Sequence, residues 1–226
     1  MRMEFHQIAH IESAHPSKFG VPRQSGLAPS DRARIVFEPE FRNPDALRGI
    51  EGFSHLWVLW IFDRNSSDGF RPTVRPPKLG GNERVGVFAT RSPYRPNPIG
   101  LSVVKIEKLE PLRDKGLTIV VSGADMTDGT PILDIKPYLP YADSIPTARG
   151  GFADEVGEKI AVDFPEELLE KLPPDDRAAV AELLALDPRP GYQDDPERVY
   201  GMEYSDYNIR FVVKNSRLTV VSVDKK

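Results

Sequence analysis

The chain has 226 residues, of which 39% are hydrophobic and 28% are charged, a balance typical of a globular protein that buries a core. It contains no cysteine, which excludes disulfides, thiolate metal ligands and a cysteine nucleophile. The longest apolar run, Phe53–Phe62, is too short to cross a bilayer, and the charged N-terminus shows no secretory signal. We therefore expect a cytoplasmic protein without a membrane span.

The formal net charge of −4 is unevenly distributed along the chain. Residues 64–95 carry seven Lys or Arg against Asp68 and Glu83, a net charge of +5, whereas residues 151–200 carry fourteen acids against five bases, a net charge of −9. A local basic stripe can dock a phosphate backbone even on an acidic protein, because attraction depends on the field at the contact. A solvated basic loop balanced by an acidic domain explains the charges equally well.

Short strands dominate the prediction for the first 145 residues. Runs of β-branched or aromatic residues bounded by Gly, Pro or Asp predict strands at Arg34–Phe37, Leu56–Phe62, Arg84–Thr90, Leu101–Leu109, Leu117–Val121 and Ile132–Ile135. Six prolines between residues 71 and 98 exclude a helix or a central strand there, so we expect an ordered loop around the strand at 84–90. Many strands without intervening helices favour a barrel or sandwich over a βαβ fold.

The composition changes after about Gly150. Pro165–Leu172 starts with proline and carries acids in its first turn, which predicts a helix, and Asp175–Leu186 predicts a second one. Asn208–Val213 and Leu218–Val223 predict a hairpin. The expected fold is mainly β, with an N-terminal barrel domain at 1–148 and a small α+β domain at 149–226.

Two common kinds of site lack support in the sequence. No glycine-rich loop of the dinucleotide-binding or P-loop type is present. His6, His10 and His15 are spread over an N-terminal strand and loop, and a lone histidine in an apolar stretch, such as His55, is more often a hydrogen-bonded core residue than a metal ligand. We predict no metal site.

The segment from Arg71 to Gly100 is unusually rich in arginine and proline. Arginines on a proline-stiffened loop are held at low entropic cost, which suits binding of phosphate or carboxylate groups. Tyr94, between Arg91 and Arg95, is placed to stack on a base. The alternative is that these arginines pair with acids of the second domain.

Two further polar segments stand out. Asp125-Met-Thr-Asp-Gly-Thr-Pro131, followed by Asp134, contains a strong turn, and its carboxylates are either solvated or available to ribose hydroxyls, an amine or a transferred proton. Pro22-Arg-Gln-Ser-Gly26 is a loop rich in hydrogen-bonding groups.

Together these segments resemble the TsaA-like family, whose full-length bacterial form is a tRNA (adenine-N(6))-methyltransferase. The resemblance covers nearly the whole chain. Its matching strings are Val21-Pro-Arg-Gln24, Phe53-Ser-His-Leu-Trp57, Arg71-Pro-Thr-Val-Arg-Pro-Pro77, Leu79-Gly-Gly-Asn82, Val87-Phe-Ala-Thr-Arg-Ser92, Arg95-Pro-Asn-Pro-Ile-Gly100, Asp128-Gly-Thr-Pro131, Asp134-Ile-Lys-Pro-Tyr-Leu-Pro140, Asp187-Pro-Arg-Pro190 and Tyr207-Asn-Ile-Arg210.

The resemblance implies a β-barrel methyltransferase outside the Rossmann class, working as a homodimer that binds S-adenosylmethionine near the subunit interface. The implied reaction converts N(6)-threonylcarbamoyladenosine beside the anticodon of threonine tRNA to its N(6)-methyl derivative.

By the position of the matching motifs, the resemblance implies that the following residues contact the cofactor: Gln24, Ser25, Gly26, Asp63, Arg64, Arg91, Leu101, Asp125, Met126, Thr127 and Asp128. Asp128, or a polarised water, is the candidate to accept the proton of the acceptor nitrogen. Arg71, Arg75, Arg91 and Arg95, with Tyr94, are the candidates for contact with tRNA or the threonyl carboxylate.

Two other classes of function stay open at this stage. The chain could hold tRNA, a nucleotide or S-adenosylmethionine without chemistry. It could also be a hydrolase that uses Asp125, Asp128 and Asp134 around a metal ion, although no histidine lies near them in the sequence.

Overall fold

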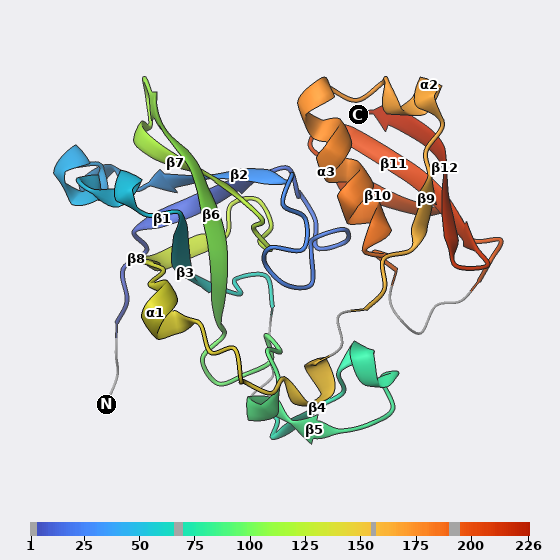
Figure 1. Cartoon of the computed structure of the whole chain (residues 1–226), viewed down its shortest axis with the longest axis horizontal. Helices are drawn as coiled ribbons and strands as arrows, with labels where there is room; N and C mark the ends of the chain where they lie inside the picture. Colours follow the sequence, from blue (N-terminus) through green and yellow to red (C-terminus); the bar gives the residue numbers. More distant parts are fainter. Residues whose placement is uncertain (1–3, 66–69, 155–156, 190–194) are drawn as a thin grey trace.

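The structure is a computed structural model that describes residues 4–65, 70–154, 157–189 and 195–226. Asp68, which the sequence places in the basic segment, lies outside the described residues. The described chain forms two packed regions and an extended arm (Figure 1). None of the described helices is both long and apolar enough to span a membrane.

Six strands form a closed barrel in the N-terminal region. They are β1 (Ala9–Ser13), β2 (Arg32–Phe37), β3 (His55–Ile61), β6 (Ile99–Leu112), β7 (Gly116–Ser122) and β8 (Pro131–Pro137). Their hydrogen-bonded order is β1-β2-β7-β6-β3-β8, and β1 closes the ring because it pairs with both β2 and β8. Each neighbouring pair is antiparallel.

The barrel interior is the first hydrophobic core. Buried and half-buried residues alternate along β3, as expected of a strand with one face toward the core. Inward side chains from all six strands fill this core, among them Ile11, Ile35, Leu56, Val104, Ile119 and Ile132. The expectation of a mainly β architecture is confirmed.

The C-terminal region has its own sheet, in the order β10-β11-β12-β9. These strands are β9 (Ala161–Asp163), β10 (Tyr200–Tyr204), β11 (Tyr207–Lys214) and β12 (Arg217–Lys225), and the helices are α2 (Glu166–Leu169) and α3 (Pro174–Ala185). The second core forms between α3 and this sheet and contains Val180, Leu184, Ile209, Phe211 and Val220.

The proline-rich arm leaves the barrel after β3 and returns at β6 (Figure 1). It contains β4 (Thr73–Val74), the 3-10 turns η4 (Pro77–Leu79) and η5 (Val87–Ala89), and β5 (Val85–Gly86). The predicted strand at 84–90 is therefore wrong beyond Gly86. The chain turns there because Thr90 donates its hydroxyl and its amide to the carbonyl of Val87.

The remaining short helices lie between these elements. They are η1 (Pro39–Phe41), η2 (Pro44–Leu47), η3 (Ile50–Gly52), α1 (Pro140–Asp143) and η6 (Gly151–Ala153). Of the two predicted helices, the one at 175–186 is confirmed by α3, but the one at 165–172 ends at Leu169, four residues before Pro173. The hairpin of β11 and β12 is confirmed, while β9 and β10 were not predicted.

The loop between β1 and β2 joins the two regions. Ala28 of this loop belongs to the second core, although residues 1–148 were predicted as one domain. The Ser205 amide donates to the Ala14 carbonyl at 2.6 Å, and Ser30 donates its amide and hydroxyl to Glu182 on α3. The buried Asp31 carboxylate contacts His15 at 2.6 Å and accepts from the Tyr204 hydroxyl at 3.1 Å.

One glycine on β6 makes room for a tryptophan side chain of β3. Gly100 pairs with Trp60 across β3 and β6, and a Cβ at Gly100 would stand 2.1 Å from the Trp60 ring. We predict that Gly100→Ala lowers the free energy of unfolding by about 1–3 kcal/mol, because the indole must leave its position.

The measurement is urea denaturation beside the matched control Gly86→Ala. A Cβ at Gly86 meets nothing within 4 Å and the residue has no positive φ, so this variant should stay within about 1 kcal/mol of the parent. Equal stability of the two variants would contradict the account of the Trp60 contact.

Candidate functional site

A cavity of about 670 Å³ opens where the barrel meets the arm and the loop between β1 and β2. Its aromatic wall is formed by Trp60 and Phe62, whose rings lie 4.2 Å apart between centroids. The other lining residues are Lys18, Val21, Pro22, Arg23, Gln24, Asp63, Arg64, Asn65, Thr90, Arg91, Pro93, Arg95, Asn97, Ile99, Gly100, Leu101, Asp125, Met126, Thr127 and Thr130. Four segments that are far apart in the sequence, 18–24, 60–65, 90–101 and 125–130, therefore meet at one hollow.

Most of the expected cofactor contacts line this cavity. They are Gln24, Asp63, Arg64, Arg91, Leu101, Asp125, Met126 and Thr127. Ser25, Gly26 and Asp128 do not line it. Ser25 and Asp128 each adjoin a residue that does, and Gly26 lies two residues from Gln24. Ser25 supports the wall, since its hydroxyl accepts from the Val103 amide at 3.2 Å. Gly26 holds the loop in place by donating its amide to the Gly123 carbonyl at 2.8 Å.

Asp125 is a half-buried acidic residue in the wall of the cavity. Burial raises its pKa, while hydrogen bonds from Ser102 and from its own amide, together with the charge of Arg91, act in the opposite direction. Its carboxylate accepts a hydrogen bond from the Ser102 hydroxyl at 2.5 Å. A carboxylate with little water around it attracts a cation or a hydrogen-bond donor strongly.

Asp128 is exposed and lies in the loop between β7 and β8. Its hydrogen bonds tie this loop to the end of β1. Its carboxylate accepts the Ser13 amide at 3.0 Å, and its own amide donates to the His15 carbonyl at 2.9 Å. Its carbonyl accepts from Arg64 at 2.5 Å, and the same guanidinium donates to the Pro16 carbonyl at 2.9 Å. Arg64 thus fastens two loops of the cavity to each other through backbone oxygens.

Arg91 and Gln24 meet across the mouth of the cavity. A nitrogen of the Arg91 guanidinium donates to the Gln24 amide oxygen. Arg95 is half-buried and donates to the Thr90 carbonyl at 2.9 Å. Both arginines are therefore held in place on cavity walls, where they offer cationic donors to an anionic group.

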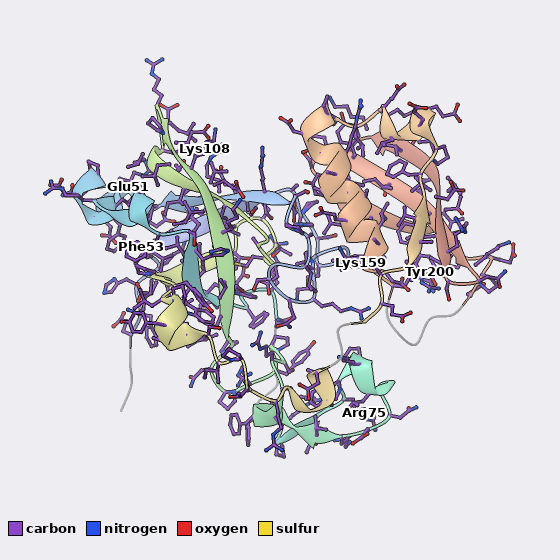
Figure 2. All side chains as sticks on the ribbon, in the orientation of Figure 1. Glu51, Phe53, Arg75, Lys108, Lys159 and Tyr200 are labelled. Atoms are coloured by element: carbon purple, nitrogen blue, oxygen red, sulfur yellow. The ribbon has the colours of Figure 1, made fainter. Side chains whose placement is uncertain are left out.

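The other candidates for RNA contact lie outside the cavity. Arg71 and Arg75 are exposed on the arm, where Figure 2 labels Arg75, and Tyr94 is 51% exposed. Among the described residues, no acid of the C-terminal region pairs with Arg71, Arg75, Arg91 or Arg95. The alternative of arginines neutralised by the second domain has no support there.

Sequence reasoning missed the polar residues buried around the site. His15 and Asp31 are buried and paired, whereas His55, expected in the core, is half-buried and bonded to the Ser54 hydroxyl. Ser102 and Trp60 were not singled out either. A serine at an inward position of an apolar strand was the available signal for Ser102.

The described residues offer no set of side chains that could bind a metal ion. These residues contain no group of three or more His, Asp or Glu side chains placed to bind an ion. Asp134, the third acid of the hydrolase alternative, instead pairs with Lys136 at 3.1 Å.

The raised pKa of Asp125 predicts a pH-dependent stability. The folded protein holds this proton to higher pH than the unfolded chain, so the stability that Asp125 contributes is present below its ordinary pKa and is lost as pH rises. We predict that Asp125→Asn unfolds at higher urea concentration than the parent near neutral pH, and that the difference shrinks toward about pH 3.9.

Urea denaturation at a series of pH values measures this difference. Asp134→Asn is the control, because that carboxylate is exposed and ion-paired, and it should show no comparable gain. An Asp125→Asn protein that is less stable than the parent at neutral pH would indicate that Asp125 serves the fold and not a ligand.

Comparison with known proteins gives a consistent result. Residues 10–144 match the family model of the tRNA-methyltransferase O N-terminal domain, and residues 157–226 match that of the TrmO C-terminal domain. A tRNA (adenine(37)-N6)-methyltransferase of Escherichia coli strain K12 is 41% identical over 232 residues, which cover 99% of this chain and 98% of that protein.

Two further comparisons involve Pseudomonas aeruginosa. A putative S-adenosylmethionine-dependent methyltransferase is 44% identical over 212 residues, 90% of each chain. The crystal structure of a TrmO superposes with a TM-score of 0.81 at 35% identity and covers 99% of both chains. The chain therefore belongs to the tRNA-methyltransferase O family.

Proposed function

We propose that this chain transfers the methyl group of S-adenosylmethionine to the exocyclic nitrogen of N(6)-threonylcarbamoyladenosine, beside the anticodon of threonine tRNA. As a member of its family it is an S-adenosylmethionine-dependent tRNA adenine-N(6) methyltransferase. The observation that carries the finer proposal is the cavity, which combines an aromatic wall, one half-buried carboxylate and two anchored arginines.

The cavity has the size and the chemistry that the donor requires. Its volume of about 670 Å³ lies within the range of small-molecule sites. The Trp60 and Phe62 rings suit a purine or a thioether, and Asp125 suits a cationic group. Bound there, S-adenosylmethionine supplies an electrophilic methyl group, so the protein's task is to align the acceptor nitrogen and exclude water.

The arginines are suited to the acceptor. A threonylcarbamoyl group ends in a carboxylate, and Arg91 and Arg95 present guanidinium donors at the cavity wall. Its carbonyl withdraws electrons from the acceptor nitrogen and makes the N–H proton easier to remove. We propose that both arginines bind this carboxylate and that Arg71, Arg75 and Tyr94 contact the surrounding tRNA.

The proton of the acceptor nitrogen needs a base. We keep Asp128 as the proposed acceptor, because it is exposed to solvent and follows three residues that line the cavity. Its carboxylate can pass the proton to water directly. In this scheme residues 1–148 carry the reaction, and the domain at 149–226 adds contacts to the tRNA.

Large apolar side chains are exposed on the arm and beside the cavity, which supports a homodimer. Leu101 lines the cavity and is 53% exposed, and Phe88 on the arm is 72% exposed. The Phe88 ring stacks on that of Phe70, which is 60% exposed, and an exposed apolar patch commonly marks an interface. Sedimentation over a range of concentrations tests this, and a monomer throughout would contradict it. Because its substrate is tRNA, we place the enzyme in the cytoplasm.

The central experiment offers labelled S-adenosylmethionine with two preparations of threonine tRNA, one carrying the threonylcarbamoyl group and one lacking it. We predict that label enters only the modified tRNA. Label in both preparations would contradict the proposed substrate. Label in neither, with folded protein and competent tRNA, would favour a binding module without chemistry.

Two variants assign the roles. Arg91→Ala should lower kcat/KM by about 10- to 100-fold, the effect of losing hydrogen bonds to a charged group. Asp128→Ala should lower turnover while tRNA affinity stays near that of the parent. Equal loss of tRNA affinity and turnover in Asp128→Ala would indicate a binding role.

A further inference from the structure

A chain of buried hydrogen bonds reaches the cavity from inside the barrel wall. The Trp60 indole N–H donates to the Ser102 hydroxyl oxygen at 2.9 Å, and the Ser102 hydroxyl donates to Oδ1 of Asp125 at 2.5 Å. Trp60 is 6% exposed and Ser102 is 1% exposed. Trp60 is thus linked through Ser102 to a carboxylate of the site.

The chain has a fixed direction. An indole nitrogen can only donate, so the Ser102 oxygen must accept from it, and the one hydroxyl proton of Ser102 is left for Asp125. Buried hydrogen bonds of this kind strengthen each other. Trp60 therefore determines where the Ser102 proton points, and Ser102 determines which way the carboxylate faces.

The strand register makes this arrangement possible. Trp60 on β3 pairs with Gly100 on β6, and Ser102 stands two residues further along β6, at the diagonal position. The absence of a side chain at Gly100 lets the indole lie across the strand and reach Ser102. The same indole lines the cavity beside Asp125.

Several charged groups face Asp125 from other elements. Arg91 of the arm acts on it directly and is itself held by Gln24 of the loop between β1 and β2. The other charged residues that line the cavity are Lys18, Arg23, Asp63, Arg64 and Arg95. Burial raises the pKa of Asp125, and the hydrogen bond from Ser102 is the largest influence that lowers it.

We propose that Ser102 and Trp60 are positioning residues, which fix the Asp125 carboxylate so that it binds a cationic group of the methyl donor. This inference rests on the proposed function. S-adenosylmethionine carries two cations, an ammonium and a sulfonium. S-adenosylhomocysteine keeps only the ammonium, and methylthioadenosine has neither, so the three ligands separate the two sources of charge.

The experiment is calorimetric titration of the full chain and its variants with the three ligands over a range of pH. Ser102→Ala should weaken S-adenosylmethionine binding by about tenfold, as expected for a lost hydrogen bond to a charged group. As the pH is lowered, the affinity of this variant should also be lost at a higher pH than that of the parent. Without the Ser102 hydroxyl the pKa of Asp125 is higher, so the carboxylate takes up a proton sooner. Trp60→Phe should shift both properties in the same direction by a smaller amount.

Ser122→Ala is the matched control. Ser122 is also a buried barrel serine with its hydroxyl on a carboxylate, but that carboxylate belongs to Glu107, which does not line the cavity. This variant should bind all three ligands like the parent. Methylthioadenosine affinity should stay within about twofold of the parent in Ser102→Ala, because no charge is recognised.

The outcomes are distinct. Equal weakening of S-adenosylmethionine and S-adenosylhomocysteine assigns the ammonium to Asp125, and weakening of S-adenosylmethionine alone assigns the sulfonium. Equal weakening of methylthioadenosine, or an unshifted pH profile, would overturn the proposal. Failure of the parent to bind S-adenosylmethionine would instead overturn the proposed function, and the inference with it.

Discussion

The loop between β1 and β2 is fastened on two sides, and the shape of the site depends on this. On one side Asp31 bonds to His15 and to the Tyr204 hydroxyl of the C-terminal sheet, and Ala28 is buried in the second core. On the other side Gly26 bonds to Gly123, just before the Asp125 loop. A cavity wall made of loop is thereby fixed by hydrogen bonds and burial on both sides, and precise alignment of two substrates requires such a fixed wall.

The cavity concentrates groups that a stability-optimised fold would avoid. Asp125 is a half-buried carboxylate whose ionised form is costly, and Ser102 and Trp60 bury polar atoms beside a core that consists mainly of aliphatic side chains. Each of these is satisfied by the next, so the chain of hydrogen bonds contains no orphan along its length. Burial of the Asp125 carboxylate lowers the stability of the fold, and such a loss of stability is consistent with a role in ligand binding.

The sequence predicted local structure well where the periodicity was strong. The hydrophobic pattern of α3, the alternation in β3 and the hairpin of β11 and β12 are properties of single segments. The strand predicted at 84–90 was wrong because hydrogen bonds of Thr90 turn the chain after Gly86. Most of the cofactor contacts carried over by resemblance converge on the cavity, whereas Ser25 and Asp128 adjoin lining residues and Gly26 lies two residues from Gln24.

The residues that sequence analysis overlooked are those defined by contacts between distant segments. His15 and Asp31 are 16 residues apart and meet only because the loop folds back, and Trp60 reaches Ser102 only through the register of β3 on β6. Neither relation is visible in a hydrophobic pattern, because strand register is set by the whole barrel.

The central claim, that the donor binds against Trp60 and Asp125, is tested most directly by intrinsic fluorescence. The chain has two tryptophans, and Trp57 is bonded to Asp143, outside the residues that line the cavity. In Trp57→Phe only Trp60 remains, and the account predicts a saturable change in its emission as S-adenosylmethionine is added, at the concentrations that calorimetry gives for binding. Binding by calorimetry with no response from Trp60 would place the donor elsewhere and contradict the account.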